Sequence, residues 1–238
     1  MHPVHLLTRL LASSAALALA VPVQPDMAPS AKLVARDSPF ADLDLPADFW
    51  GAMDNYCRNG VSSKRRSVPR HLSQRGSPPA GYLYVSPGTS VRDYESTTTY
   101  GAYTDALVTC MGVVIVGDTT DGDATSKHMA HFYADANALD ALWGTVASEV
   151  SAQGLANLRG WISLADRAAV PSDLDTGLML DVENKMKDLV AGLTGQPATV
   201  RYHNMFDASE GVEDVGSMQY NNADKSVLID GVVVEFGT

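Results

Sequence analysis

Apolar residues change their spacing along this chain, and the spacing separates strands from helices. Continuous or alternating apolar runs at 82–85, 107–116 and 128–133 predict three strands. Two later stripes recur every three or four residues and predict helices. The first stripe consists of Leu139, Leu142, Trp143, Val146 and Val150, and the second of Leu178, Val182, Met186, Leu189, Val190 and Leu193.

The residues that flank both stripes fit helix ends. Asp135 precedes the first stripe as an N-cap, and Gly154 follows it as a stop. Gly195 ends the second stripe in the same way. Further strands are expected at 158–164, 199–203, 217–220 and 226–236, with a tight hairpin turn at Asp230-Gly231. This order of elements predicts the α/β class, as a mixed β-sandwich flanked by helices.

The first 20 residues have the pattern of a secretory signal peptide. Arg9 closes a short basic region, an apolar stretch runs from Leu10 to about Val23, and Ala18-Leu19-Ala20 is a small-residue cleavage site. We therefore expect a secreted, extracellular protein. Later segments fall short of the roughly 20 consecutive apolar residues that a membrane span needs, so no membrane association is expected.

Residues 21–79 are rich in Pro, Ser and Arg and predict a propeptide or flexible arm before a globular domain at 80–238. Lys64-Arg65-Arg66 within it is either a processing site or solvated linker charge. One ordered piece is expected inside the arm. Phe49, Met53 and Cys57 recur every fourth residue after Pro46, which is the spacing of one face of a short helix.

Charge is divided unevenly between the two parts of the chain. The net charge is −11, yet the first 75 residues hold more Lys and Arg than Asp and Glu. The acidic excess therefore lies in the domain, which should repel nucleic acid and anionic lipid. Neither is an expected partner, and oligomeric state stays open.

Candidate catalytic residues lie at the start of one predicted strand and on the next predicted strand. Cys110 heads the apolar run, and an adjacent imidazole can hold a cysteine as the reactive thiolate. His128 and His131 are three residues apart, so on a strand they point to opposite faces and only one can face Cys110.

The same stretch resembles the CheD-type chemoreceptor glutamine deamidases. That family has a Thr six residues before a Cys, then a β run, then Met-Ala-His, which Thr104, Cys110 and Met129-Ala130-His131 match. The catalytic domains of cytotoxic necrotizing factors resemble CheD in fold and carry a Leu-Ser-Gly-Cys motif, of which Leu107 and Cys110 are kept here.

The resemblance implies a CheD-like fold and a thioester mechanism without a cofactor. Cys110 would attack the carboxamide of a glutamine on a partner protein, with His131 as general acid and base and Thr104 as the group that orients the imidazole. Water would then release glutamate. Capture of the same thioester by an amine, which gives transglutamination, stays open.

The two cysteines of the chain support a different interpretation. Secreted proteins tend to pair their cysteines, and a disulfide between Cys57 and Cys110 would leave no nucleophile. The protein would then be a non-enzymatic secreted effector or binding protein on the same scaffold. A third hypothesis joins both: the disulfide caps the nucleophile in a precursor, and cleavage at Lys64-Arg65-Arg66 followed by reduction releases it.

Metal sites are not expected. Asp118, Asp121 and Asp123 resemble part of a calcium loop, but the ligand order and the final Glu of an EF-hand are missing. His203 stands alone on a predicted strand, and the histidines show no metal-ligand spacing.

Overall fold

A computed structural model describes residues 38–59, 78–92, 99–119, 125–203 and 216–237. The expected signal peptide, the Lys64-Arg65-Arg66 cluster, Asp121 and Asp123 lie outside these residues. Asp37–Thr238 form one compact unit. Within the described part of the chain, none of the helices has the length and apolarity to cross a membrane.

Within the described residues, ten strands form two mixed five-stranded sheets. Sheet A has the order β1 (Tyr82–Tyr84), β3 (Gly101–Thr104), β8 (Met218–Asn221), β9 (Val227–Ile229) and β10 (Val232–Val233). Sheet B has the order β2 (Thr89–Arg92), β5 (Thr125–Phe132), β4 (Met111–Asp118), β6 (Ala156–Ala165) and β7 (Thr199–His203). β1 with β3 and β6 with β7 are the parallel pairs, and the other neighbours are antiparallel.

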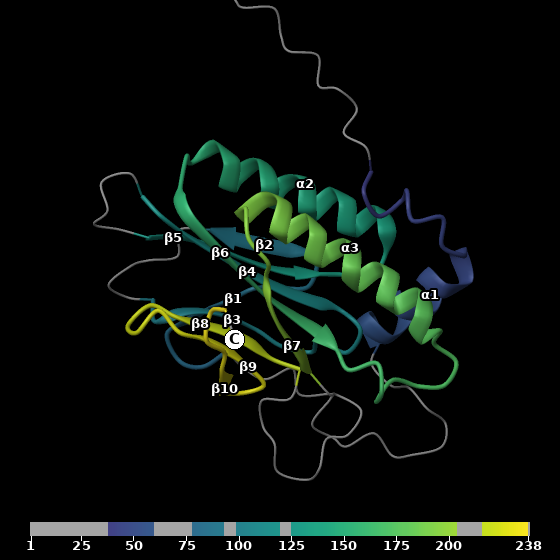
Figure 1. Cartoon of the computed structure of the whole chain (residues 1–238). Helices are drawn as coiled ribbons and strands as arrows, with labels where there is room; N and C mark the ends of the chain where they lie inside the picture. The colour runs from purple at the N-terminus through teal and green to yellow at the C-terminus, as the bar shows by residue number, and fades with distance from the viewer. Residues whose placement is uncertain (1–37, 60–77, 93–98, 120–124, 204–215, 238) are drawn as a thin grey trace, which may run out of the picture. The chain divides into compact units, whose positions relative to one another are not determined.

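The described elements form three layers, in which sheet B lies between two helices and sheet A (Figure 1). The helices are α2 (Ala136–Ala152) and α3 (Thr176–Thr194). Gly160 of β6 faces α3, because a Cβ there would clash with Val190. Gly112 of β4 faces sheet A, since a Cβ there would lie 2.8 Å from the sulfur of Met218. The predicted α/β sandwich with flanking helices is confirmed.

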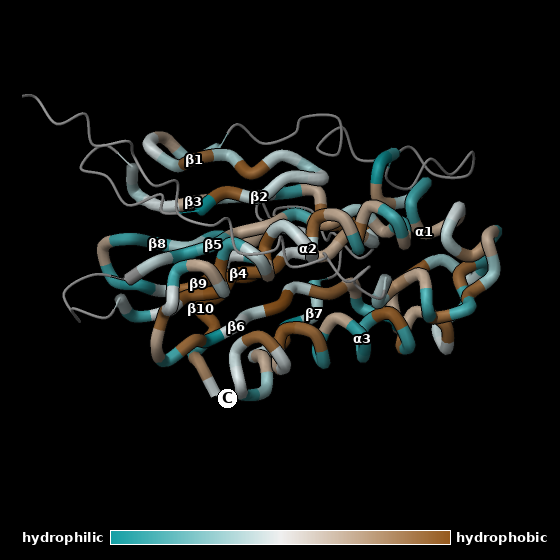
Figure 2. Tube along the Cα trace, turned by 90° about the horizontal axis from the view of Figure 1, so that it is seen from above, coloured by the Kyte–Doolittle hydropathy of each residue, from teal (hydrophilic) through white to brown (hydrophobic). Residues whose placement is uncertain are grey.

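Sheet B is buried on both faces, which explains its unbroken apolar runs. In β4 the residues from Met111 to Gly117 are all buried. Figure 2 marks hydrophobic stretches in brown on both strands and helices. The core therefore lies along both faces of this sheet.

The helix ends follow the expected signals. The Asp135 carboxylate accepts a hydrogen bond from the Ala138 N–H at 2.9 Å and caps α2. Asp175 caps α3, and Gly195 ends it with φ 75°, a left-handed conformation that glycine adopts without a steric penalty. Asp230 and Gly231 also have positive φ and join β9 to β10, as predicted for the hairpin.

Two strand predictions needed correction. β2 and β3 were not expected, because neither has a long apolar alternation; both are strands through pairing with β5 and with β1 and β8. The predicted strand from Leu107 begins only at Met111. Ala106 has φ 58°, and the Val108 N–H bonds to its carbonyl, so a turn occupies the start of the run.

Helix α1 (Ala47–Asn59) is the helix expected after Pro46, and its predicted apolar face is confirmed. Phe49, Met53 and Cys57 are buried in the core together with Trp50. Just before it, the Phe40 N–H donates to Asp140 of α2 at 2.8 Å. Residues 38–59 therefore pack as part of the compact unit, although they fall within the stretch expected to be an arm.

Candidate functional site

Thr104 and His131 form a buried hydrogen bond that joins the two sheets. Thr104 ends β3 in sheet A, and His131 lies on β5 in sheet B. The Thr104 Oγ1 lies 2.7 Å from the His131 Nδ1, and both side chains have no exposed surface. The structure thus brings together two of the three residues that the resemblance selected.

The same threonine defines the tautomer of neutral His131. The Thr104 hydroxyl donates its single proton to the Val85 carbonyl at 2.8 Å. It must therefore accept from His131, so Nδ1 carries the proton and Nε2 carries the lone pair. This is the arrangement in which a histidine can take a proton through Nε2 while a third group orients the ring.

Cys110, the third predicted residue, lies beside this imidazole but is oxidised. It forms a disulfide with Cys57 of α1, with 5.0 Å between the two Cα atoms. A ring nitrogen of His131 and the two sulfurs all lie within 4.8 Å of one another. Cys110 is wholly buried, so while the disulfide persists it offers neither a thiol nor access.

His128 faces the opposite side of sheet B, as its spacing from His131 predicted. Its Nδ1 lies 3.8 Å from Glu149, and its Nε2 lies 3.3 Å from Gln153, both reached on the side of α2. Ser126 donates to the same Gln153 side chain at 2.6 Å. His128 is therefore part of the contact between β5 and α2 and is not near Cys110.

His203 belongs to the site and was missed by the sequence analysis. It ends β7, is wholly buried, and its Nδ1 lies 2.8 Å from the hydroxyl of Ser163 on β6. Its Nε2 lies 3.4 Å from the carbonyl of Val108, two residues before Cys110. Burial, with a smaller contribution from the charge of His131, lowers the pKa of His203 to about 3.

The segment before Cys110 is fixed by one contact at each of three successive residues. The Leu107 N–H donates to the Gly216 carbonyl at 3.0 Å, and Val108 contacts His203. The Thr109 hydroxyl donates to the Met53 carbonyl of α1 at 2.6 Å. The position of Cys110 thus depends on the segment just before β8, on β7 and on α1.

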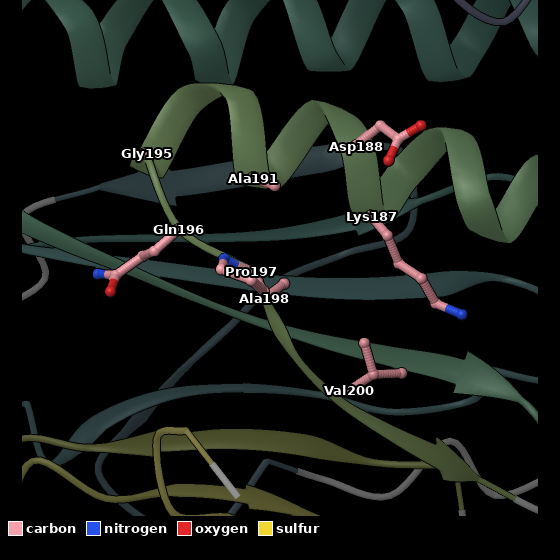
Figure 3. Close-up of a pocket in the computed structure, with 8 residues that line it drawn as sticks. All are labelled: Lys187, Asp188, Ala191, Gly195, Gln196, Pro197, Ala198 and Val200. Atoms are coloured by element: carbon pink, nitrogen blue, oxygen red, sulfur yellow. The ribbon is translucent and has the colours of Figure 1, made fainter.

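A surface hollow of about 440 Å³ lies elsewhere, between the second half of α3 and the start of β7 (Figure 3). Small side chains such as Ala191 and Ala198 form part of its lining, and Lys187 is already near Glu183 and Tyr202. None of Thr104, Cys110 and His131 lines it. This hollow is not an entrance to the candidate site.

Metal binding at the same three side chains would require the reduced state. Cys57, Cys110 and His131 are the one group of three potential ligands found in the part of the chain that the structure describes. Zinc binds cysteine as the thiolate, and the disulfide has none. The oxidised site has no metal-binding chemistry at sulfur.

Comparisons with known proteins identify no family for this chain. The chain matches no protein-family model, no curated protein and no solved structure. What the fold and site define is a two-sheet α/β protein with a buried Thr–His pair beside a disulfide.

Proposed function

We propose that this chain is a secreted, CheD-like, cysteine-dependent protein-glutamine deamidase held in a disulfide-capped resting state. The observation that carries the proposal is the convergence of Thr104, His131 and Cys110 from three separate segments. The resemblance named these residues from sequence spacing alone. A buried threonine that fixes the histidine tautomer beside a cysteine supports that assignment.

Activation first requires reduction of the disulfide. Two thiols of a cellular reductant give up two hydrogen atoms, form their own disulfide, and leave Cys57 and Cys110 as thiols. His131 Nε2 then takes the Cys110 proton, which gives a thiolate and imidazolium pair. Thr104 keeps its bond to the Nδ1–H throughout.

The chemical steps need only these side chains and water. The thiolate attacks the side-chain carbonyl carbon of a glutamine, and the C–N bond breaks as His131 protonates the departing ammonia. His131 then takes a proton from water, and the hydroxide attacks the thioester carbonyl. Cleavage of the C–S bond yields glutamate and returns Cys110. The substrate is a protein with an exposed glutamine, and no metal or cofactor takes part.

The proposal is tested in the chain with Cys57→Ser, because Cys110 is then its single cysteine. The pKa of the Cys110 thiol is read from the ultraviolet absorbance of the thiolate as a function of pH. We expect a value below the ordinary 8.5 or so, and a return toward that value or above it in His131→Ala. His128→Ala is the matched control, since it removes a buried histidine from the other face of the same strand.

Deamidation itself is then measured by mass spectrometry of a glutamine-rich unfolded protein incubated with the same variants. Glutamine should convert to glutamate with Cys57→Ser and not with Cys57→Ser combined with Cys110→Ala. A thiol pKa that does not respond to His131→Ala would refute the proposal whatever the substrate assay gives.

The observed disulfide favours a second candidate, a non-enzymatic secreted effector or binding protein that uses Cys57–Cys110 as a structural bond. Burial of both sulfurs fits that role directly. A scaffold has no need of a reactive thiol. The second candidate therefore predicts an ordinary or raised thiol pKa for Cys110 in the Cys57→Ser chain.

A further inference from the structure

We propose that His203 is a positioning residue that holds the segment before Cys110 in the form in which Cys110 faces His131. The inference rests on the proposed function, which gives Cys110 and His131 their roles. It adds a fourth side chain, from the far edge of sheet B, to the three that the sequence selected.

The placement of His203 follows from the strand register. His131, Gly112, Ser163 and Arg201 face one another across β5, β4, β6 and β7. Side chains in such a row lie on one face of the sheet, and His203, two residues after Arg201, lies on the same face. This face is directed at sheet A, as the position of Met218 against Gly112 shows.

The hydrogen bonds of His203 assign its protons. The Val108 carbonyl can only accept, so the contact at 3.4 Å requires the proton on Nε2. Nδ1 then accepts from the Ser163 hydroxyl at 2.8 Å. His131 has the opposite tautomer, with its proton on Nδ1. One imidazole therefore presents a donor to the backbone before Cys110, while the other lies beside the sulfurs with its lone pair on Nε2.

The neutral state of His203 suits this task. Burial is the main reason that its pKa falls to about 3, so the ring carries no charge at neutral pH. A positive charge there would oppose the imidazolium of His131, which the proposed thiolate pair requires. The donor to Val108 is thus provided without a competing charge.

The contact from His203 does not depend on α1. The Thr109 hydroxyl bonds to the Met53 carbonyl, so that anchor requires the helix to be in place. Val108 is the neighbouring residue, and its contact is to His203 at the end of β7. Of the three anchors at 107–109, those at Leu107 and Val108 are therefore independent of α1, and the one at Val108 is the nearer to Cys110 along the chain.

The test uses the Cys57→Ser chain and compares three further changes. His203→Leu removes both hydrogen bonds, and His203→Gln keeps an amide that can donate to Val108 and accept from Ser163. His128→Leu is the control for loss of a buried histidine on the other face. The pKa of the Cys110 thiol is read from thiolate absorbance, and the free energy of unfolding is measured with urea.

We expect His203→Leu to raise the thiol pKa by about one unit or more, which is about a tenfold fall in the acid dissociation constant of the thiol. His203→Gln should restore most of it. His128→Leu should lower stability without moving the thiol pKa. An unchanged thiol pKa in His203→Leu, or an equal rise in His128→Leu, would overturn the inference.

The result with His131→Ala separates this inference from the proposed function. If His131→Ala raises the thiol pKa and His203→Leu does not, His203 has no positioning role while the deamidase proposal stands. If His131→Ala leaves the thiol pKa unchanged, the proposed function is refuted, and the role of His203 that rests on it is refuted with it.

Discussion

The guanidinium carbon of Arg58 lies 3.7 Å from the centre of the Tyr133 ring, so the last turn of α1 stacks on the residue that follows β5. On the same helix, the Tyr56 hydroxyl donates to the Asp173 carboxylate at 2.8 Å. The disulfide is therefore one of several attachments. α1 should stay docked when Cys57 and Cys110 are reduced, and Cys110 should remain partly shielded.

Loosening α1 should therefore expose Cys110 in the reduced protein. A cation–π contact contributes about 0.5–1 kcal/mol at exposed sites, so Arg58→Ala should speed alkylation of Cys110 by about threefold. The rate is followed by intact mass after reduction. The oxidised Arg58→Ala protein is the control and should take up no label. Equal rates with and without Arg58 would show that this contact does not hold the helix.

Reduction should also lower stability. A disulfide between residues 53 positions apart restricts the unfolded chain, and the chain-entropy model gives about 4 kcal/mol for a loop of this length. Urea unfolding with and without reductant measures the difference. In Cys57→Ser the reductant should have no further effect, because one cysteine remains. A difference near zero would mean that strain or residual structure cancels the entropy.

Stability should fall in mild acid because of His203. Its pKa is about 3 when folded and near 6.5 when exposed, so the unfolded state binds the extra proton between these values. The stabilising effect of the neutral ring is thus complete above about pH 6.5 and is lost as the pH falls toward 3, by up to about 1.4 kcal/mol per pH unit.

Urea unfolding from pH 7 down to pH 4 tests this dependence. His203→Gln, which does not titrate, should show a shallower fall over that range than the parent chain. Identical slopes would show that His203 is not the group that takes up the proton.

Thr104 should affect reactivity and stability together. Thr104→Val leaves the buried His131 Nδ1–H without its oxygen acceptor, which costs about 1–3 kcal/mol. With the ring no longer oriented, the thiolate fraction of Cys110 in Cys57→Ser should also fall. Thr104→Ser keeps the hydroxyl and should restore both. Thiolate absorbance gives the thiol pKa, and urea unfolding gives the free energy of unfolding. A thiol pKa that is unchanged in Thr104→Val would argue against an orienting role.

The long helices and strands could be predicted because the spacing of their apolar residues and their flanking residues match the face that each element buries and the place where it ends. The stripe from Leu178 to Leu193 is amphipathic and ends at Gly195, and α3 has these features. The turn at Ala106 could not be foreseen, because a positive φ at alanine comes from tertiary contacts of its neighbours, such as the bond from Leu107 to Gly216.

The candidate site was predicted in part for similar reasons. The proximity of Thr104, His131 and Cys110 was expected from one motif within a short stretch. His203 lies far along the chain from them, and only the parallel pairing of β6 with β7 brings it to Ser163 and Val108. Sequence offers a single histidine on a strand there, which is equally typical of an ordinary core position.

The apolar face of α1 has a practical meaning for handling the protein. A fragment that begins at Pro78 would lack Phe49, Met53 and Cys57, and the core surface that they cover would meet water. Its single remaining cysteine would then lie beside an exposed apolar patch. Such a patch favours self-association, and the cysteine could then form disulfides between molecules in air. Residues 38–59 therefore keep this apolar surface covered. A synthetic peptide of that segment, added separately, should prevent the self-association of such a fragment.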